Sequence, residues 1–107
     1  MDILHLDKPY FSNLNSSFEV VENQSFNISV TANAYPLPIS YTWFHPTGRQ
    51  LMTDQVNIFV NDNQLSLMNI QRNDLGIYRC VATNPLGTTE VNFTLNVLCM
   101  SKIDDFF

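Results

Sequence analysis

The chain has 107 residues, of which 45% are hydrophobic, so it is long enough for one domain with its own core and too short for two. A net charge of −5, with only five lysines and arginines, argues against nucleic acid or an anionic membrane as a partner. No apolar run approaches the roughly 18 residues that a membrane-spanning helix needs.

Alternating hydrophobic residues bounded by turn residues predict a chain built of strands, with no helix of useful length. In chain order, the predicted strands span residues 4–11, 18–21, 25–32, 39–44, 49–52, 56–60, 65–70, 79–83 and 89–97. The first strand is weak, and Pro9 suits a sheet edge because it cannot donate a backbone hydrogen bond. Residues 33–38 are predicted to form a loop, and residues 61–64 a polar turn.

The most specific pattern is D-x-G-x-Y-x-C at residues 74–80, which follows L-x-L-x-x-I and a tryptophan further upstream. Its members are Trp43, Leu65, Leu67, Ile70, Asp74, Gly76, Tyr78 and Cys80. The two leucines have the parity of a strand with one buried face. Asp74 and Gly76 supply the short acceptor and the residue without a Cβ that a tight corner needs. Tyr78 and Cys80 then point inward from the next strand.

This constellation resembles the immunoglobulin superfamily, and the intermediate (I-set) type within it, over roughly residues 17–98. The resemblance implies an all-β fold, an immunoglobulin-like two-sheet antiparallel β-sandwich with Greek-key connections. It also implies that Tyr78 makes the tyrosine-corner hydrogen bond and that Cys80 lies against Trp43. On this basis we divide the chain into an edge strand or linker (1–12), an I-set domain (13–98), and a C-terminal linker or the start of the next segment (99–107).

One half of the family's disulfide is missing. The family's second strand usually reads E-G-x-S-V-x-L-x-C-x-A, and in the matching residues 22–32 Val30 stands at the cysteine position. We therefore expect no intramolecular disulfide and a buried thiol at Cys80. If residues 84–87 form a tight turn, Cys80 lies opposite Val91, and Cys99 is about 25 Å further along the strand. That separation exceeds the Cα–Cα limit of about 7 Å for a disulfide. Cys99 is expected to be accessible, either for an inter-chain or inter-domain bond or as an ordinary thiol.

Four N-x-S/T sequons begin at Asn15, Asn23, Asn27 and Asn92. Glycan attachment requires a solvent-facing asparagine in a secreted chain. Strand parity predicts that Asn27 and Asn92 face water on different sheets, and Asn23 falls at a turn. The chain is rich in Asn and Ser, so one or two chance sequons are expected, but four exposed ones favour an extracellular origin.

The sequons also restrict where a protein partner can bind. Glycans on Asn27 and Asn92 would cover both sheet faces and leave the end formed by the loops 33–38, 61–64 and 84–87. Tyr35 and Leu37 are the best apolar contact candidates at this end, although such residues also simply shape turns.

The second candidate surface is a sheet face. Phe44 is expected to point outward beside Arg79 on the sheet that contains Cys80. It is the contact candidate there if Asn92 carries no glycan, and the alternative is a phenylalanine that merely tolerates solvent.

No pattern predicts an enzyme, a cofactor or a metal site. His5 and His45 are isolated in the sequence, and no ligand spacing for a metal is present. Cys80 is expected to be buried rather than activated by a base. Residues 1–3 lack the basic start of a signal peptide, so an extracellular protein would carry its signal and anchor outside this segment.

The leading hypothesis is an extracellular protein-recognition module of a cell-surface adhesion molecule or receptor. It would bind the same or another cell-surface protein, and the isolated segment would be a monomer or a weak dimer without membrane contact of its own. Invertebrate allorecognition receptors also look similar, which would imply homophilic self/non-self recognition. The alternative is a structural I-set domain of an intracellular titin-like muscle or cytoskeletal protein, because a reducing cytosol makes the disulfide unnecessary. The cysteines favour the alternative, and the sequons favour the leading hypothesis.

Overall fold

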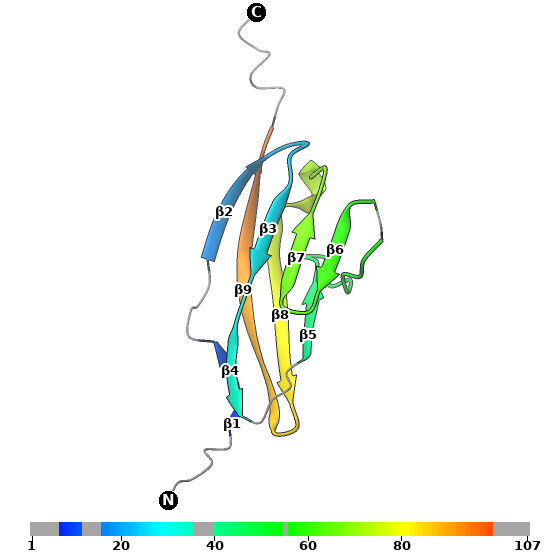
Figure 1. Ribbon diagram of the computed structural model, residues 1–107. Helices are drawn as coiled ribbons and strands as arrows, with labels where there is room; N and C mark the ends of the chain where they lie inside the picture. Colours follow the sequence, from blue (N-terminus) through cyan, green and yellow to red (C-terminus); the bar gives the residue numbers. More distant parts are fainter. Residues whose placement is uncertain (1–6, 12–15, 36–39, 55, 100–107) are drawn as a thin grey trace, which may run out of the picture.

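The computed structural model describes residues 7–11, 16–35, 40–54 and 56–99, which form two large β-sheets packed face to face and one small sheet (Figure 1). The elements are β1 (Asp7–Phe11), β2 (Ser16–Val21), β3 (Phe26–Ser29), β4 (Ala32–Tyr35), β5 (Ser40–Phe44), β6 (Ile58–Asn61), β7 (Gln64–Leu67), the 3-10 helix η1 (Arg72–Asp74), β8 (Gly76–Asn84) and β9 (Gly87–Leu98). The strand orders are β2-β9-β8-β5 and β3-β7-β6, and β1 pairs with β4. This arrangement confirms the predicted all-β sandwich.

The long hairpin of β8 and β9 fixes the register of the larger sheet. Asn84 pairs with Gly87 across the turn, and the ladder then places Cys80 opposite Val91, as the sequence predicts. On the other side of β8, Cys80 pairs with Trp43 of β5. At the far edge β2 runs parallel to β9, so this one pairing departs from the antiparallel pattern.

The predicted strand over residues 25–32 is divided in the structure. β3 pairs with β7, whereas β4 pairs with β1, and Val30 lies between the two pairings. Both backbone groups of Val30 are bonded to Asn63: its N–H donates to the Asn63 carbonyl at 3.0 Å, and its carbonyl accepts from Asn63 Nδ2 at 2.7 Å. These bonds satisfy the backbone where the strand changes partners. The loop predicted from residue 33 starts later, because β4 continues to Tyr35.

The predicted strand over residues 49–52 is wrong. The chain turns sharply after β5, with the N–H of His45 donating to the Arg49 carbonyl at 2.8 Å. Only an isolated bridge between Phe44 and Gln50 and one bond from Leu51 N to Trp43 O, 2.8 Å long, follow this turn. The segment therefore lies beside the edge of β5 without forming a ladder.

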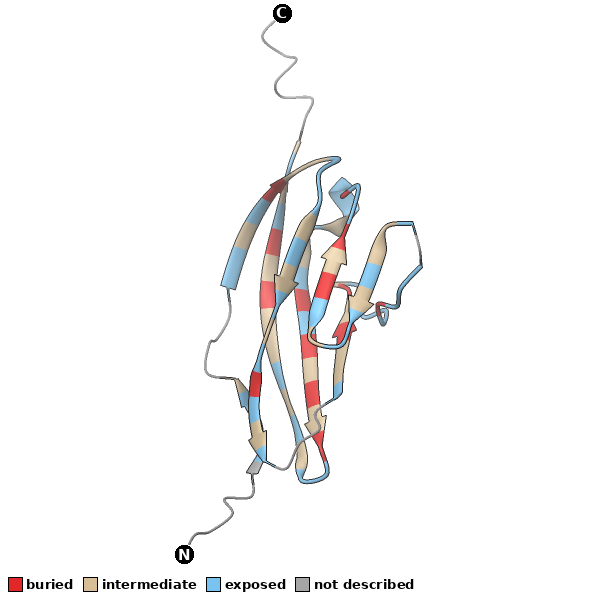
Figure 2. Cartoon of the chain, viewed as in Figure 1, coloured by how far each residue is buried: buried red, intermediate tan, exposed pale blue. Residues whose placement is uncertain are grey.

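The core lies between the two large sheets. Figure 2 shows buried residues alternating with more exposed ones along β7 and β8, as expected for strands with one buried face. The largest fully buried side chains are those of Trp43, Tyr78, Leu65, Ile70, Leu95, Pro9 and Cys80. Trp43 also donates its indole N–H to the Asp62 carbonyl at 2.9 Å, so its polar atom is satisfied inside the sandwich.

The corner before β8 supplies a test of the packing. Gly76 has a φ of +132°, and a Cβ added there would lie 2.7 Å from Pro46 Cβ, whereas Gly48, with a φ of +96°, faces open space. Gly48→Ala should therefore cost only backbone strain, about 1–2 kcal/mol. Gly76→Ala should destabilise the domain by about 2 kcal/mol more, because the proline ring cannot move aside. Urea unfolding of both variants measures the difference, and equal losses would contradict the close contact.

Candidate recognition surfaces

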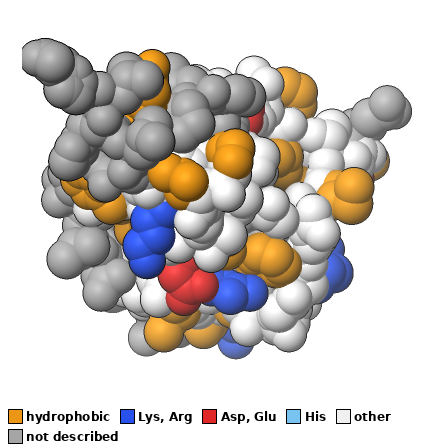
Figure 3. Space-filling model, turned by 90° about the horizontal axis from the view of Figure 1, so that it is seen from below, with side chains coloured by type: hydrophobic (Ala, Val, Ile, Leu, Met, Phe, Trp, Pro, Cys, Tyr) orange, Lys and Arg blue, Asp and Glu red, His pale blue; other side chains and the backbone are white. Residues whose placement is uncertain are grey.

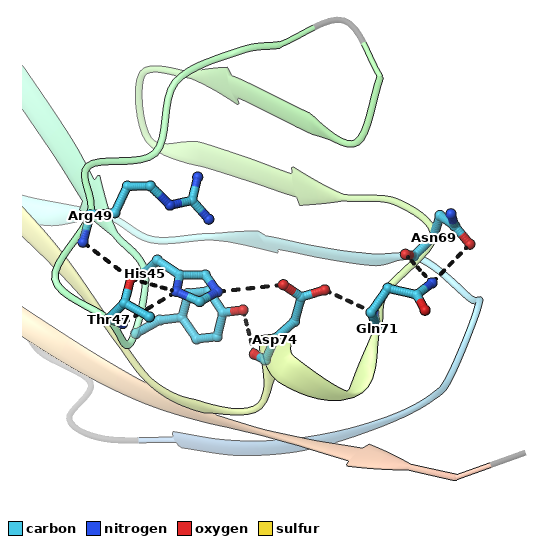
Figure 4. Close-up of polar contacts among 7 residues, drawn as sticks. His45, Thr47, Arg49, Asn69, Gln71 and Asp74 are labelled. Atoms are coloured by element: carbon cyan, nitrogen blue, oxygen red, sulfur yellow. Dashed lines mark hydrogen bonds and ion pairs between the residues drawn. The ribbon is translucent and has the colours of Figure 1, made fainter.

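The corner between η1 and β8 is held by Tyr78 and Asp74. Figure 4 shows Asp74 there with its neighbours His45 and Gln71. The phenol of Tyr78 donates to the backbone carbonyl of Asp74 at 2.5 Å, which is the tyrosine-corner bond implied by the sequence pattern. The Asp74 carboxylate accepts from the Gln71 N–H at 2.8 Å and closes the turn of η1. Burial is the main cause that raises the pKa of Tyr78, so its hydroxyl remains a donor.

His45 joins this corner and is not isolated, contrary to the sequence-based expectation. It is only 8% exposed, and its Nε2 lies 3.4 Å from Asp74 Oδ1. Its Nδ1 lies 3.1 Å from the Thr47 hydroxyl, and its ring packs edge-on against Tyr78 at 5.4 Å between centroids. Sequence reasoning missed the pair because Asp74 is 29 residues away along the chain. The contacts of this group fix the corner to the β5–β6 connection.

Cys80 is completely buried, and burial raises the pKa of its thiol to about 12. The thiolate needed for nucleophilic or redox chemistry is therefore not formed near neutral pH. Val30 is half-buried and packs against the core cluster that contains Cys80 and Trp43. At the position of the family's disulfide, the interior thus holds the thiol of Cys80 and the aliphatic side chain of Val30.

Cys99 follows the end of β9 and is half-buried. No disulfide joins it to Cys80. Its sulfur lies 2.6 Å from Nη2 of Arg72 in η1, so the side chain packs against the same end of the molecule as the corner. Pairing of Cys99 outside this chain stays a prediction.

Tyr35 lies at the end of β4, at the lower end of the molecule in Figure 1, where the β8–β9 hairpin turns. It is 44% exposed, and Leu86 in the hairpin turn is exposed to a similar extent. Leu37 lies outside the described residues. At this end Tyr35 and Leu86 are thus exposed apolar side chains that belong to different strand pairs.

The outer face of β5, β8 and β9 carries a connected group instead. Phe44 pairs across the strands with Arg79, whose guanidinium carbon lies 4.4 Å from the centroid of the phenylalanine ring. Nη1 of Arg79 lies 3.1 Å from Oε1 of Glu90 on β9. Seen from the lower end, basic and acidic side chains lie next to each other beside hydrophobic ones (Figure 3). Glu90 was not among the predicted contacts, although the hairpin register would have placed it diagonal to Arg79.

The sequons differ in their surroundings. Asn27 is exposed on β3 opposite Ser66, in the sheet that does not contain Cys80. Asn23 is exposed in a turn with a φ of +74°, and its side chain accepts from Gln71 Nε2 at 3.1 Å. Asn92 pairs across the strands with Arg79 and is half-buried rather than fully exposed. Asn15 lies outside the described residues. Glycosylation at all four stays a prediction.

Within the described ranges, no three histidine, cysteine, aspartate or glutamate side chains gather into a group that could hold a metal ion. No helix in those ranges is long and apolar enough to cross a membrane. The surfaces described above are therefore the features to compare with known proteins.

A family model described as the immunoglobulin I-set domain matches residues 9–97. Among curated proteins, the chain is 37% identical to bovine neural cell adhesion molecule 1 over 89 residues, which cover 78% of this chain and 10% of that protein. It is 33% identical to human hemicentin-1 over 87 residues, 81% of this chain and 2% of that protein. The chain thus spans a small part of the length of the curated relatives that it matches.

A solved structure of the titin domain M4 matches 88% of this chain and 99% of its own, with a TM-score of 0.74. At 23% identity, this likeness shows the fold alone. Matches of similar type occur both among adhesion molecules and among titin-like proteins.

The buried thiol gives a second prediction. In a Cys99→Ser variant, Cys80 should resist a thiol reagent in the native state and react fully after denaturation without reductant. Because its pKa is raised from 9.0 to about 12, the stability contributed by the neutral thiol is present below pH 9 and is lost as the pH rises toward about 12. Alkylation followed by mass spectrometry measures the reactivity of Cys80 in both states, and urea unfolding at a series of pH values measures the loss of stability. Rapid native labelling at neutral pH would contradict the burial.

Proposed function

Because the chain belongs to the immunoglobulin I-set family, we propose that it is a protein-recognition module of an extracellular cell-surface adhesion molecule or receptor. The family and its fold are those of non-enzymatic binding modules. The proposed partner is a protein, either another copy or a different cell-surface protein. Weak binding by one isolated domain would be strengthened by clustering on a membrane.

The observation that carries the proposal is the connected group on the outer sheet face. Arg79 is held over the ring of Phe44 and beside Glu90, so its long side chain is ordered before a partner arrives. Ordering in advance reduces the entropic cost of binding. Arginine and aromatic residues also contribute disproportionately to binding energy in protein interfaces. The second proposed contact region consists of Tyr35 and Leu37, of which Leu37 lies outside the described residues.

The sequons support an extracellular location. Asn27 and Asn23 are exposed, as an oligosaccharide acceptor must be. Neural cell adhesion molecule 1, one of the relatives, is an adhesion molecule by name. We propose the same setting for this chain, as a glycoprotein ectodomain.

One observation favours a second candidate function. The interior has a buried thiol at Cys80 without a bridge, an arrangement that a reducing cytosol permits at no loss. This buried, unbridged thiol supports a structural I-set domain of an intracellular muscle or cytoskeletal protein as the alternative.

Glycan analysis separates the two functions. The mass of the natively expressed protein should fall when N-glycans are removed enzymatically, and Asn27→Gln should remove part of that difference because Asn27 is exposed on a sheet face. A protein whose mass is unchanged and that fractionates with the cytosol would support the structural alternative instead.

The contact surface is tested by two matched truncations. Phe44→Ala should weaken cell–cell adhesion by more than about 1 kcal/mol, because it removes both a ring and the support of Arg79. Tyr35→Ala removes an aromatic side chain at the end of the domain and should have a smaller effect. Cells displaying each variant, matched for surface expression, provide the measurement. The reverse order would assign the contact to the Tyr35 end, and no effect from either would count against both surfaces.

A further inference from the structure

We infer that the outer face of β5, β8 and β9 binds a second copy of this chain, face to face about a two-fold axis. The inference rests on the proposed function as a recognition module and names the partner. It follows from the charges on this face, from their positions, and from the way the preceding segment covers the edge of β6.

The face is electrically neutral on a strongly acidic chain. The described residues that point outward from its three strands are Ser40, Thr42, Phe44, Ile77, Arg79, Val81, Thr83, Thr88, Glu90, Asn92, Thr94, Asn96 and Leu98. The only charged side chains in this set are those of Arg79 and Glu90, which cancel, whereas the whole chain has a net charge of −5. Two copies that approach through this face thus avoid the mutual repulsion that other orientations meet.

The positions of the two charges make the face complementary to itself. Arg79 pairs across the strands with Asn92, and Val81 pairs with Glu90, so these four residues form one block of two neighbouring strands. For two faces packed on each other, the two-fold axis lies in the interface plane. An axis that passes over the centre of the block, perpendicular to the diagonal from Arg79 to Glu90, exchanges these two corners. Arg79 of one copy then meets Glu90 of the other, and this pair occurs twice, as a symmetric dimer interface requires.

Apolar side chains surround the charged pair. Ile77 is 60% exposed on β8, and Phe44 lies on β5 with its ring covered on one side by Arg79. Both can be buried when a second face packs on the first, and burial of apolar area supplies the favourable free energy of association. The charged pair then sets orientation and partner choice.

Another mode of self-association is blocked by the fold. An exposed sheet edge can add a strand from another copy. On β6 the outward backbone groups are already bonded to the preceding segment: Thr53 Oγ1 accepts from Val60 N at 2.9 Å, and Asp54 Oδ1 accepts from Ile58 N at 2.8 Å. The Asp54 side chain acts as a carboxylate, because the backbone N–H groups of Val56, Ile58 and Asn57 donate to it and lower its pKa. The β6 edge of the second sheet is thus occupied, so self-association through a sheet face is favoured over strand addition at this edge.

In the same geometry, glycosylation of Asn92 would determine whether the dimer can form. Asn92 lies in the central block, beside the axis, so an oligosaccharide attached there would separate the two copies. Self-association should therefore be confined to chains without a glycan on Asn92. Removing N-glycans from secreted protein should increase dimer formation, and an unchanged dimer fraction would overturn this part of the inference.

Charge exchange tests the dimer directly. Sedimentation equilibrium of the unglycosylated chain up to millimolar concentration should show a monomer–dimer equilibrium. Arg79→Glu and Glu90→Arg each place like charges against each other across the axis, so either variant alone should dimerise at least about tenfold more weakly. An equimolar mixture of the two should recover the association as a heterodimer, because each variant then offers the charge that the other lacks.

The control is Arg49→Glu, which changes the net charge as Arg79→Glu does but lies in the exposed loop after β5. It should leave the dimer unchanged. Failure of the mixture to recover association would overturn the face-to-face arrangement. A chain that stays monomeric at millimolar concentration, while Arg79→Glu still abolishes adhesion of cells, would identify a different protein as the partner. In that case the inference fails and the proposed function stands.

Discussion

The two sheets are joined by ring contacts that centre on Phe93. Its ring stacks on that of Tyr78 with 5.0 Å between centroids, and it meets Trp43 edge-on at 6.3 Å within the same sheet. Phe26 of β3, in the opposite sheet, lies 5.7 Å from Phe93 and 5.2 Å from Phe18. Because Phe26 comes from the strand that would normally carry the first cysteine, these contacts join the sheets where the family uses a disulfide.

The absence of that disulfide has a calculable cost. A bridge closing a loop of about 50 residues would contribute roughly 4 kcal/mol in the chain-entropy model. Aromatic pairs contribute about 1 kcal/mol each beyond the area that they bury, so the pairs around Phe93 are of comparable total size. Val30 packs against the core cluster as a half-buried aliphatic residue, and both of its backbone groups are bonded to Asn63. The domain can thus keep the family's architecture with different interior chemistry.

Local rules predicted the sandwich because its strongest signals are local: parity along strands, and the short turn that sets the register of β8 and β9. They failed where pairing depends on distant residues. The division between β3 and β4 follows from the side chain of Asn63, 33 residues beyond Val30. The contact of His45 with Asp74, and the end of pairing after β5, likewise depend on tertiary approach. On the candidate surface, Phe44 and Arg79 were predicted as neighbours from parity. Glu90 was missed because its role becomes visible only when the hairpin ladder is followed diagonally.

Strand β9 explains how the outer face can vary without loss of the fold. Phe93 points into the core and is almost completely buried, while Asn92 and Thr94 on either side of it point outward. The sequon N-F-T therefore spans both faces, with its asparagine and hydroxyl outside and the central aromatic residue of the core between them. A shift of one residue in the register of β9 would exchange its inward and outward side chains. The tight β8–β9 turn fixes this register and so keeps each set on its own face. Substitutions at outward positions such as Glu90 can change a partner while the ring contacts remain. The outward residues of this sheet can consequently diverge in sequence, whereas the core residues beneath them cannot.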